Sequence, residues 1–136
     1  MQTEGISFSL EDKLAIARRL DELGVDYVEG GYPASGPKDA QFFAETAKLG
    51  LSNCKIVAFG STRRIDSKAE DDASLNAILA CKAPAATIVG KTWDLHVKED
   101  LRIALKANLE VVSDSIAYLK KNTDKVFFDA EHFFDG

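Results

Sequence analysis

The chain has 136 residues, of which 46% are hydrophobic and 29% charged, a balance typical of a folded globular domain. Its net charge is −5, with acids and bases interspersed, which argues against a nucleic-acid partner because such a partner calls for a basic stripe. No apolar run approaches the ~20 residues of a membrane span, and the first nine residues lack the pattern of a secretory signal, so we expect no membrane association.

Two cysteines, Cys54 and Cys81, lie in apolar segments and do not form a CxxC spacing. This pattern favours buried free thiols over a disulfide or a metal site. Free thiols are typical of a reducing compartment, so we expect the protein to be cytoplasmic.

The first helix is predicted to begin at Ser9, because Ser9 and Asp12 have the spacing of a capping box. Leucines and alanines then recur at helical spacing, and Gly24 supplies the residue that most easily takes the left-handed conformation at a helix end. Residues 25–29 follow as a short apolar strand.

Three more helix and strand pairs follow. A helix from Pro37 to about Lys48 precedes a strand at 54–59, and a helix at 71–82 precedes a strand at 86–89. The fourth helical stretch precedes a strand at 126–130 and carries an unbroken apolar stripe. The stripe consists of Leu101, Leu105, Leu109, Val112, Ile116 and Leu119.

Short, almost continuously apolar strands that alternate with helices indicate a parallel sheet of the α/β class. One unit takes thirty to forty residues, close to the ~31 residues per unit of a (β/α)8 barrel. The chain then holds four strands, where a closed barrel needs eight. An open doubly wound sheet fits the same count, and periodicity does not separate the two.

Glycines and polar residues gather where the predicted strands end, in residues 29–33, 60–64, 90–96 and 129–136. Both parallel architectures place their active sites at the carboxyl ends of the strands. We therefore expect any functional site to lie at this edge.

Asp129 and Glu131 are two positions apart, so within a strand their side chains point to the same side. Mutual repulsion and apolar surroundings would raise the pKa of such carboxyls towards a range useful for proton transfer. The alternative is that both acids only form ion pairs at the rim, with Lys91, Arg63 or Arg64.

Four other residues each have two or more possible roles. Glu29 ends the first strand and reaches a substrate, caps the following helix or pairs with a neighbouring base. His96, at a helix start, is either a hydrogen-bond donor to a substrate or a structural residue. Arg63 and Arg64 either bind a phosphate or carboxylate through bidentate hydrogen bonds or are two solvent-exposed arginines on a loop.

A metal site within the chain is not predicted. Acids and histidines share the carboxyl face, but the chain has no His-x-His, HExxH or CxxC spacing. The residues considered are Asp94, His96, Asp129, Glu131, His132 and Asp135.

At the same loops the chain resembles the family of isopropylmalate, homocitrate and citramalate synthases, relatives of hydroxymethylglutaryl-CoA lyase. Residues 6–17 are similar to that family's first helix, and residues 23–33 to its second-strand motif. Residues 90–97 and 128–136 are most similar to the citramalate branch. The resemblance spans essentially the whole chain.

The resemblance implies that residues 1–136 are an incomplete (β/α)8 TIM-barrel catalytic domain, covering strands two to five. Gln2 looks like the last residue of the family's Arg-Asp-Gly-x-Gln motif, which binds a divalent metal (Mn, Mg or Zn). That motif's aspartate and the later His-x-His ligands would lie outside this chain, so no metal ligand is assigned within it. A homodimer is implied for the complete enzyme.

The implied activity is that of an acyltransferase of branched-chain amino-acid biosynthesis. It condenses acetyl-CoA with pyruvate and then hydrolyses the thioester to give citramalate. Glu131 is taken as catalytic because it matches the glutamate of the family's fifth strand, which would orient the reacting acyl group or transfer a proton. Glu29, His96 and Asp129 are taken as substrate-binding. Two alternatives remain: another 2-keto acid, as in isopropylmalate or homocitrate synthases, and a non-catalytic open α/β domain that binds a small anion or a protein.

Overall fold

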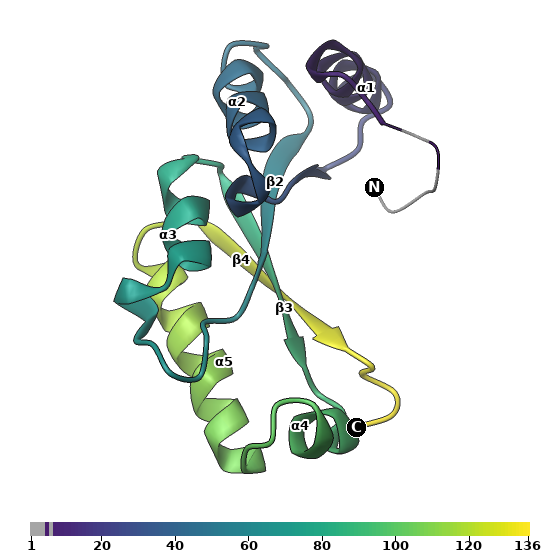
Figure 1. The fold of residues 1–136 in the computed structure, drawn as a ribbon. Helices are drawn as coiled ribbons and strands as arrows, with labels where there is room; N and C mark the ends of the chain where they lie inside the picture. Colours follow the sequence, from purple (N-terminus) through teal and green to yellow (C-terminus); the bar gives the residue numbers. More distant parts are fainter. Residues whose placement is uncertain (1–4, 6) are drawn as a thin grey trace.

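Four strands alternate with helices in the computed structural model, which describes residues 5 and 7–136 (Figure 1). Gln2 lies outside the described residues. The elements in chain order are α1 (Leu10–Glu22), β1 (Tyr27–Gly31), η1 (Pro33–Ser35), α2 (Pro37–Thr46), β2 (Lys55–Ser61), η2 (Ala69–Asp71), α3 (Ala73–Ala80), β3 (Ala85–Lys91), α4 (Asp94–Glu99), α5 (Leu105–Lys120) and β4 (Lys125–Glu131).

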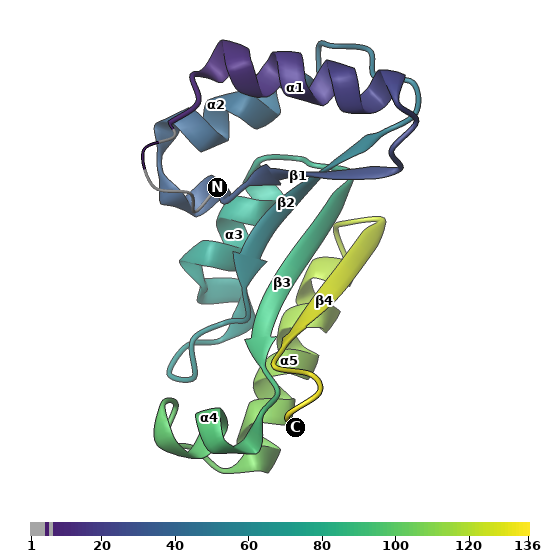
Figure 2. The same cartoon turned by 90° about the vertical axis from the view of Figure 1, so that its right-hand side faces the viewer.

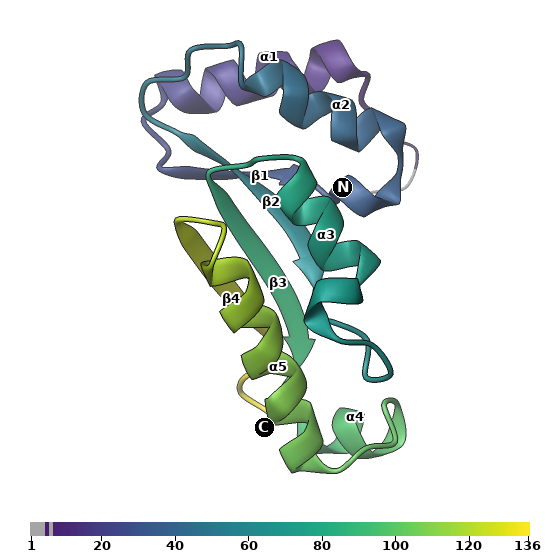
Figure 3. The same cartoon turned by 90° about the vertical axis from the view of Figure 1, so that its left-hand side faces the viewer.

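The sheet has the order β1-β2-β3-β4, and all three neighbouring pairs are parallel. Figures 2 and 3 show opposite sides of the molecule: the strands face the viewer in the first, and α3 and α5 lie in front of them in the second. A doubly wound sheet reverses its strand order and carries helices on both faces. Sequential order with helices on one face is instead the arrangement of a (β/α)8 barrel, so the predicted partial barrel is confirmed.

The first helix begins where the sequence predicts. The backbone N–H of Asp12 donates to Ser9 Oγ at 3.1 Å, and the N–H of Ser9 donates to Asp12 Oδ2 at 2.9 Å, which completes the capping box. Gly24 follows the helix with a φ of 77°, the left-handed conformation expected of a glycine stop.

The core lies between the sheet and its helices. Alternate strand residues such as Ile56 and Ile88 point towards the helices and meet Phe42, Leu75 and Leu119, all of which are buried. Gly30 permits a close approach of α2, because a Cβ at this position would lie only 2.6 Å from a ring carbon of Phe42.

The fourth helical stretch differs from its prediction. It consists of two helices, α4 and α5, because the chain turns through Arg102 at a φ of 55°. Leu101 therefore lies outside α5, and Leu109 is 67% exposed while Leu119 is fully buried. The prediction of one helical stretch with an unbroken apolar stripe was wrong, because the spacing of leucines alone does not reveal a break between two helices.

The opposite face of the sheet is concave and carries no helix of the described chain. Tyr27 on β1 and Phe127 on β4 reach across the two middle strands, with ring centroids 5.0 Å apart in an edge-to-face arrangement. A hollow of about 380 Å³ lies here and includes Glu29, Val57, Thr87 and Asp129 in its lining. This curvature matches the interior of a barrel.

Prepared alone, residues 1–136 should self-associate or melt without a sharp transition. The outer edges of β1 and β4 are unpaired within the described chain, and the concave face is partly apolar, features that promote association. Light scattering during size-exclusion chromatography is the measurement. A single monomer peak together with cooperative thermal unfolding would contradict this expectation.

Both cysteines are free thiols, as predicted: Cys54 is buried and Cys81 half-buried. Burial is the main cause that raises the pKa of each thiol above its usual value. A raised pKa leaves little thiolate at neutral pH, so these cysteines are unreactive packing residues.

No helix in the described part of the chain has the length and apolarity needed to cross a bilayer.

Asp21 holds the segment that leads into β2. Its carboxylate accepts hydrogen bonds from the backbone N–H groups of Ser52, Asn53 and Cys54, at 3.1, 2.7 and 2.7 Å. The bond from Cys54 is the main cause that lowers the pKa of Asp21 below 3.8.

This lowered pKa predicts an acid-dependent contribution to stability. The contribution is complete above the unfolded value, near 3.8, and is lost as the pH falls through the lower folded pKa. Within a complete barrel, Asp21→Asn should therefore lower the melting temperature at pH 7 and flatten its fall below pH 4. Thermal scans across pH test this, with the exposed Asp26→Asn as control; parallel pH profiles in all three proteins would refute it.

Candidate functional site

The structure places three of the predicted site residues on the concave face. In the register of the sheet, Glu29 pairs with Val57, Asp129 with Val89 and Glu131 with Lys91. Glu29 and Asp129 both line the hollow of the concave face, although they come from the two outer strands. Asp129 and Glu131 share this face, as strand alternation predicts.

Glu131, the last residue of β4, belongs to a small ionic network. Its Oε2 lies 3.3 Å from Lys91 Nζ, and the same ammonium lies 3.2 Å from Asp100 Oδ2. Desolvation acts to lower the pKa of Lys91, but its hydrogen bonds to Asp100 and Glu131 outweigh this and raise it. A charged lysine therefore stands beside the carboxylate, and the Glu131 side chain remains 41% exposed for a ligand.

Thr92 fixes the backbone at this position. Its hydroxyl donates to the carbonyl oxygen of Glu131 at 2.6 Å, and its N–H donates to the same oxygen at 3.3 Å. The ends of β3 and β4 are thus tied together beyond the regular ladder. This tie holds Glu131 on a rigid element rather than on a free loop.

His96 lies apart from the three acids, in an aromatic cluster beside the end of β4. Its ring centroid is 4.6 Å from that of Trp93 and 4.6 Å from that of His132. Trp93 also contacts His132, at 5.5 Å. His96 Nδ1 is buried and has no hydrogen-bond partner among the described residues.

His132 was not predicted as a site residue and was considered only as a metal ligand. The structure places it directly after Glu131 with a φ of 58°, and its Nδ1 lies 3.2 Å from Asp135 Oδ2. The signal in the sequence was its position immediately after the catalytic candidate. Nothing in the spacing indicated its contact with His96.

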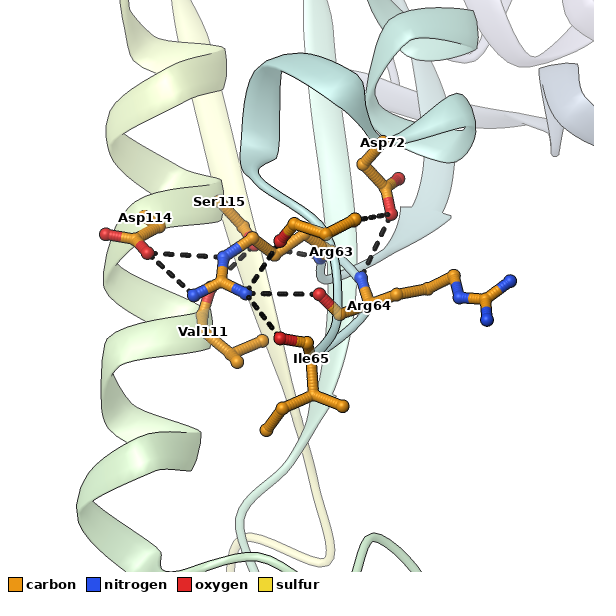
Figure 4. Close-up of polar contacts among 8 residues, drawn as sticks. Arg63, Arg64, Ile65, Asp72, Val111, Asp114 and Ser115 are labelled. Atoms are coloured by element: carbon orange, nitrogen blue, oxygen red, sulfur yellow. Dashed lines mark hydrogen bonds and ion pairs between the residues drawn. The ribbon is translucent and has the colours of Figure 1, made fainter.

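Arg63 has a structural role (Figure 4). Its guanidinium donates two hydrogen bonds to Asp114 Oδ2 on α5, from Nη2 at 2.7 Å and from Nε at 3.2 Å, and its backbone N–H donates to Ser115 Oγ at 2.9 Å. Arg64 is exposed and pairs with Asp66 at 3.2 Å. Anion binding by Arg63 is therefore not favoured, because the N–H groups of its guanidinium already donate to acceptors within the protein.

Asp72 is buried at the start of α3 and holds the loop that follows β2. Its Oδ1 accepts from the N–H groups of Ser74 and Leu75, at 2.9 and 3.0 Å. Its Oδ2 accepts from the backbone N–H of Arg64 at 3.0 Å (Figure 4). The helix predicted from residue 71 begins at Ala73, and the capping role of Asp72 was not predicted.

The described residues do not supply a ligand set for a divalent ion. No three histidine, cysteine or carboxylate side chains gather there in a way that could hold a metal. His132 is engaged with Asp135, and Glu131 with Lys91. These residues therefore do not fit a resident metal, and no chemical step of this chain is assigned to one.

Residues 1–136 alone should bind Mn²⁺ no more tightly than about millimolar, because scattered carboxylates without a preformed cage hold such ions weakly. Isothermal titration calorimetry with MnCl₂ is the measurement. Stoichiometric binding at micromolar affinity would place a metal site within this chain.

The HMGL-like family matches residues 1–135 of the chain. The chain is 53% identical to the (R)-citramalate synthase of Geobacter sulfurreducens and 48% identical to that of Aquifex aeolicus, each over 99% of its length. A homocitrate synthase of Methanothermobacter thermautotrophicus is 33% identical over 96% of the chain. The chain spans about a quarter of the length of the two citramalate synthases, 26% in each case.

Among solved structures, the chain is similar to an HMG-CoA lyase from Acinetobacter baumannii determined in complex with coenzyme A and 3-methylmalate. The TM-score is 0.58 at 14% sequence identity, and the match covers 95% of this chain and 40% of the lyase. At this identity the likeness shows the fold alone, and it agrees with the single-sided arrangement of helices on the sheet.

Proposed function

The chain belongs to the HMGL-like family, and we propose that it is part of an acyltransferase that condenses acetyl-CoA with pyruvate to give (R)-citramalate. The observation that carries this proposal is the 45–53% identity to five (R)-citramalate synthases over 99% of the chain. The similarity to a homocitrate synthase is lower, at 33%, which favours pyruvate over a longer 2-keto acid.

We propose that residues 1–136 form the part of the catalytic barrel that contains its second to fifth strands. Sequential parallel strands with helices on one face support this placement. The complete enzyme is proposed to be a cytoplasmic homodimer with its divalent ion (Mn, Mg or Zn) held by residues outside this chain. That ion would supply Lewis-acid polarisation of the keto group.

Glu131 is the proposed catalytic residue. The condensation begins when a methyl proton of acetyl-CoA passes to the Glu131 carboxylate, which gives an enolate. The enolate carbon then bonds to the keto carbon of pyruvate while the keto oxygen takes up a proton, and water finally breaks the C–S bond of the thioester to release CoA. A carboxylate that is partly exposed at the carboxyl end of a strand, on a backbone fixed by Thr92, suits the proton transfer. Lys91 Nζ lies 3.3 Å from one oxygen of this carboxylate.

Glu29 and Asp129 are proposed to contact the substrates across the concave face, and His96 from its edge. Their support is position: the two acids line one hollow from opposite outer strands. These carboxylates would accept hydrogen bonds from substrate hydroxyl or amide groups, whereas His96 offers a ring nitrogen.

The test is a chimera in which residues 1–136 replace the matching quarter of the Geobacter sulfurreducens enzyme, hereafter the chimera. At 53% identity most packing contacts between the two parts should be retained. The chimera should release CoA from acetyl-CoA in the presence of pyruvate and form citramalate, detected with a thiol reagent and by chromatography. A folded chimera that releases CoA only with longer 2-keto acids would favour the alternative substrates.

A further inference from the structure

We propose that His96 and His132 are held in opposite tautomers, and that His96 donates a hydrogen bond from Nε2 to an oxygen atom of a substrate. The proposal depends on the function above for the identity of the substrates but not for the tautomers themselves.

The tautomer of His96 follows from its buried nitrogen. Nδ1 is out of contact with solvent and has no partner among the described residues. An orphaned buried N–H group is rarer in proteins than an under-satisfied acceptor, so the lesser cost is an Nδ1 without a proton. The proton of the neutral ring then resides on Nε2, which makes this nitrogen a donor.

The tautomer of His132 follows from its partner. Its Nδ1 lies 3.2 Å from Asp135 Oδ2, and an ionised carboxylate only accepts hydrogen bonds. Nδ1 therefore carries the proton, and in the neutral ring Nε2 keeps its lone pair. Asp135 fixes this tautomer of His132. The backbone N–H of Asp135 also donates to the carbonyl oxygen of His132, at 2.9 Å.

The His96 and His132 rings pack against each other and against Trp93, which restricts their rotation. They stand edge to face at 4.6 Å and an interplanar angle of 81°, and Trp93 packs against both. The cluster adjoins Glu131, because His132 is its neighbour in the chain. We assign the His96 donor to a substrate bound beside Glu131.

The group that suits the His96 donor is a carbonyl or carboxylate oxygen. Two substrate groups have this chemistry: the thioester carbonyl of acetyl-CoA and the carboxylate of the 2-keto acid. A neutral His132 with its free lone pair on Nε2 does not serve either oxygen. The donation is therefore assigned to His96 alone.

Long-range ¹⁵N–¹H spectra of the chimera, labelled with ¹⁵N-histidine, test the tautomers directly. Signals of the two residues are assigned by their loss in His96→Gln and His132→Gln. We expect His96 to show protonated Nε2 and His132 protonated Nδ1. A His96 ring protonated at Nδ1 would overturn the proposal, whether or not the chimera is active.

Kinetics then test the donor. Glutamine places its amide N–H₂ near the position of Nε2, whereas asparagine reaches only the position of Nδ1. His96→Asn should lose about 10–100-fold in kcat/KM, as expected when a charge-assisted or buried hydrogen bond is lost, and His96→Gln should retain about tenfold more activity than His96→Asn. Equal losses in both variants would contradict donation from Nε2.

The same kinetics identify the source of the oxygen. A rise in KM confined to acetyl-CoA indicates the thioester, and one confined to pyruvate indicates the carboxylate; either supports the donor. An inactive wild-type chimera with the expected spectra would refute the proposed function and leave the tautomers established.

Discussion

Replacing Glu131 by glutamine in the chimera should lower kcat about 100-fold or more, the usual contribution of a general acid or base. Glutamine keeps the shape and much of the hydrogen bonding of the side chain but removes its charge and basicity. The KM for pyruvate should change little, because this proposal assigns the keto acid to a metal bound elsewhere in the enzyme. Steady-state kinetics with varied pyruvate at saturating acetyl-CoA is the measurement.

The matched control is Glu99→Gln, which changes an exposed glutamate at the end of α4, near the same edge of the sheet. It should leave kcat within twofold of the parent. Circular dichroism establishes that loss of the Lys91 ion pair has not disturbed the fold. If turnover of the folded Glu131 variant is unchanged, the residue is only a rim contact of Lys91 and the catalytic assignment is wrong.

Asp72→Ala should destabilise the chimera by about 2–3 kcal/mol. The substitution removes a helix cap, worth about 1 kcal/mol, and leaves buried N–H groups without a partner, each of which costs at least as much again. The side chain is only 3% exposed, so water cannot readily replace its oxygens. Thermal unfolding should show a fall of several degrees in the first transition.

The neighbouring Asp71→Ala is the control for this variant, because Asp71 is exposed and differs by one position. Hydrogen exchange separates the local effect from the global one. Amides of residues 61–68, which the N–H of Arg64 ties to Asp72, should exchange faster in the Asp72 variant alone. A loop that exchanges equally in both variants would show that Arg63 and Ser115 suffice to hold it.

The fold was predictable from the sequence because local signals and the global arrangement agree. The capping box at Ser9, the stop at Gly24 and the apolar strands are short-range patterns, and each is found in the structure. The sequence did not distinguish a barrel from a doubly wound sheet, since that choice depends on which face of the sheet each helix covers. Periodicity records only that a helix has one apolar face.

The site was less predictable for the same reason. That Asp129 and Glu131 share a face follows from strand alternation, but the contact between His96 and His132 depends on how two loops turn after their strands. The left-handed conformation at His132 is not signalled by glycine, and the break at Arg102 is hidden by a regular spacing of leucines.

The sequential order of the strands has a consequence for how the protein is made. Each strand pairs with the strand synthesised before it, so a nascent chain can complete one βα unit at a time as it leaves the ribosome. Each pairing still joins residues far apart in the chain, such as Tyr27 with Lys55 and Ala85 with Lys125, and such non-local contacts slow folding relative to a helical bundle. The meeting of Tyr27 and Phe127 is different, because it joins the first strand to the last. The contact between Tyr27 and Phe127 can therefore form only after all four strands have paired in register. Fluorescence of Tyr27, measured in stalled ribosome complexes that carry chains of increasing length, would show at which length the contact forms.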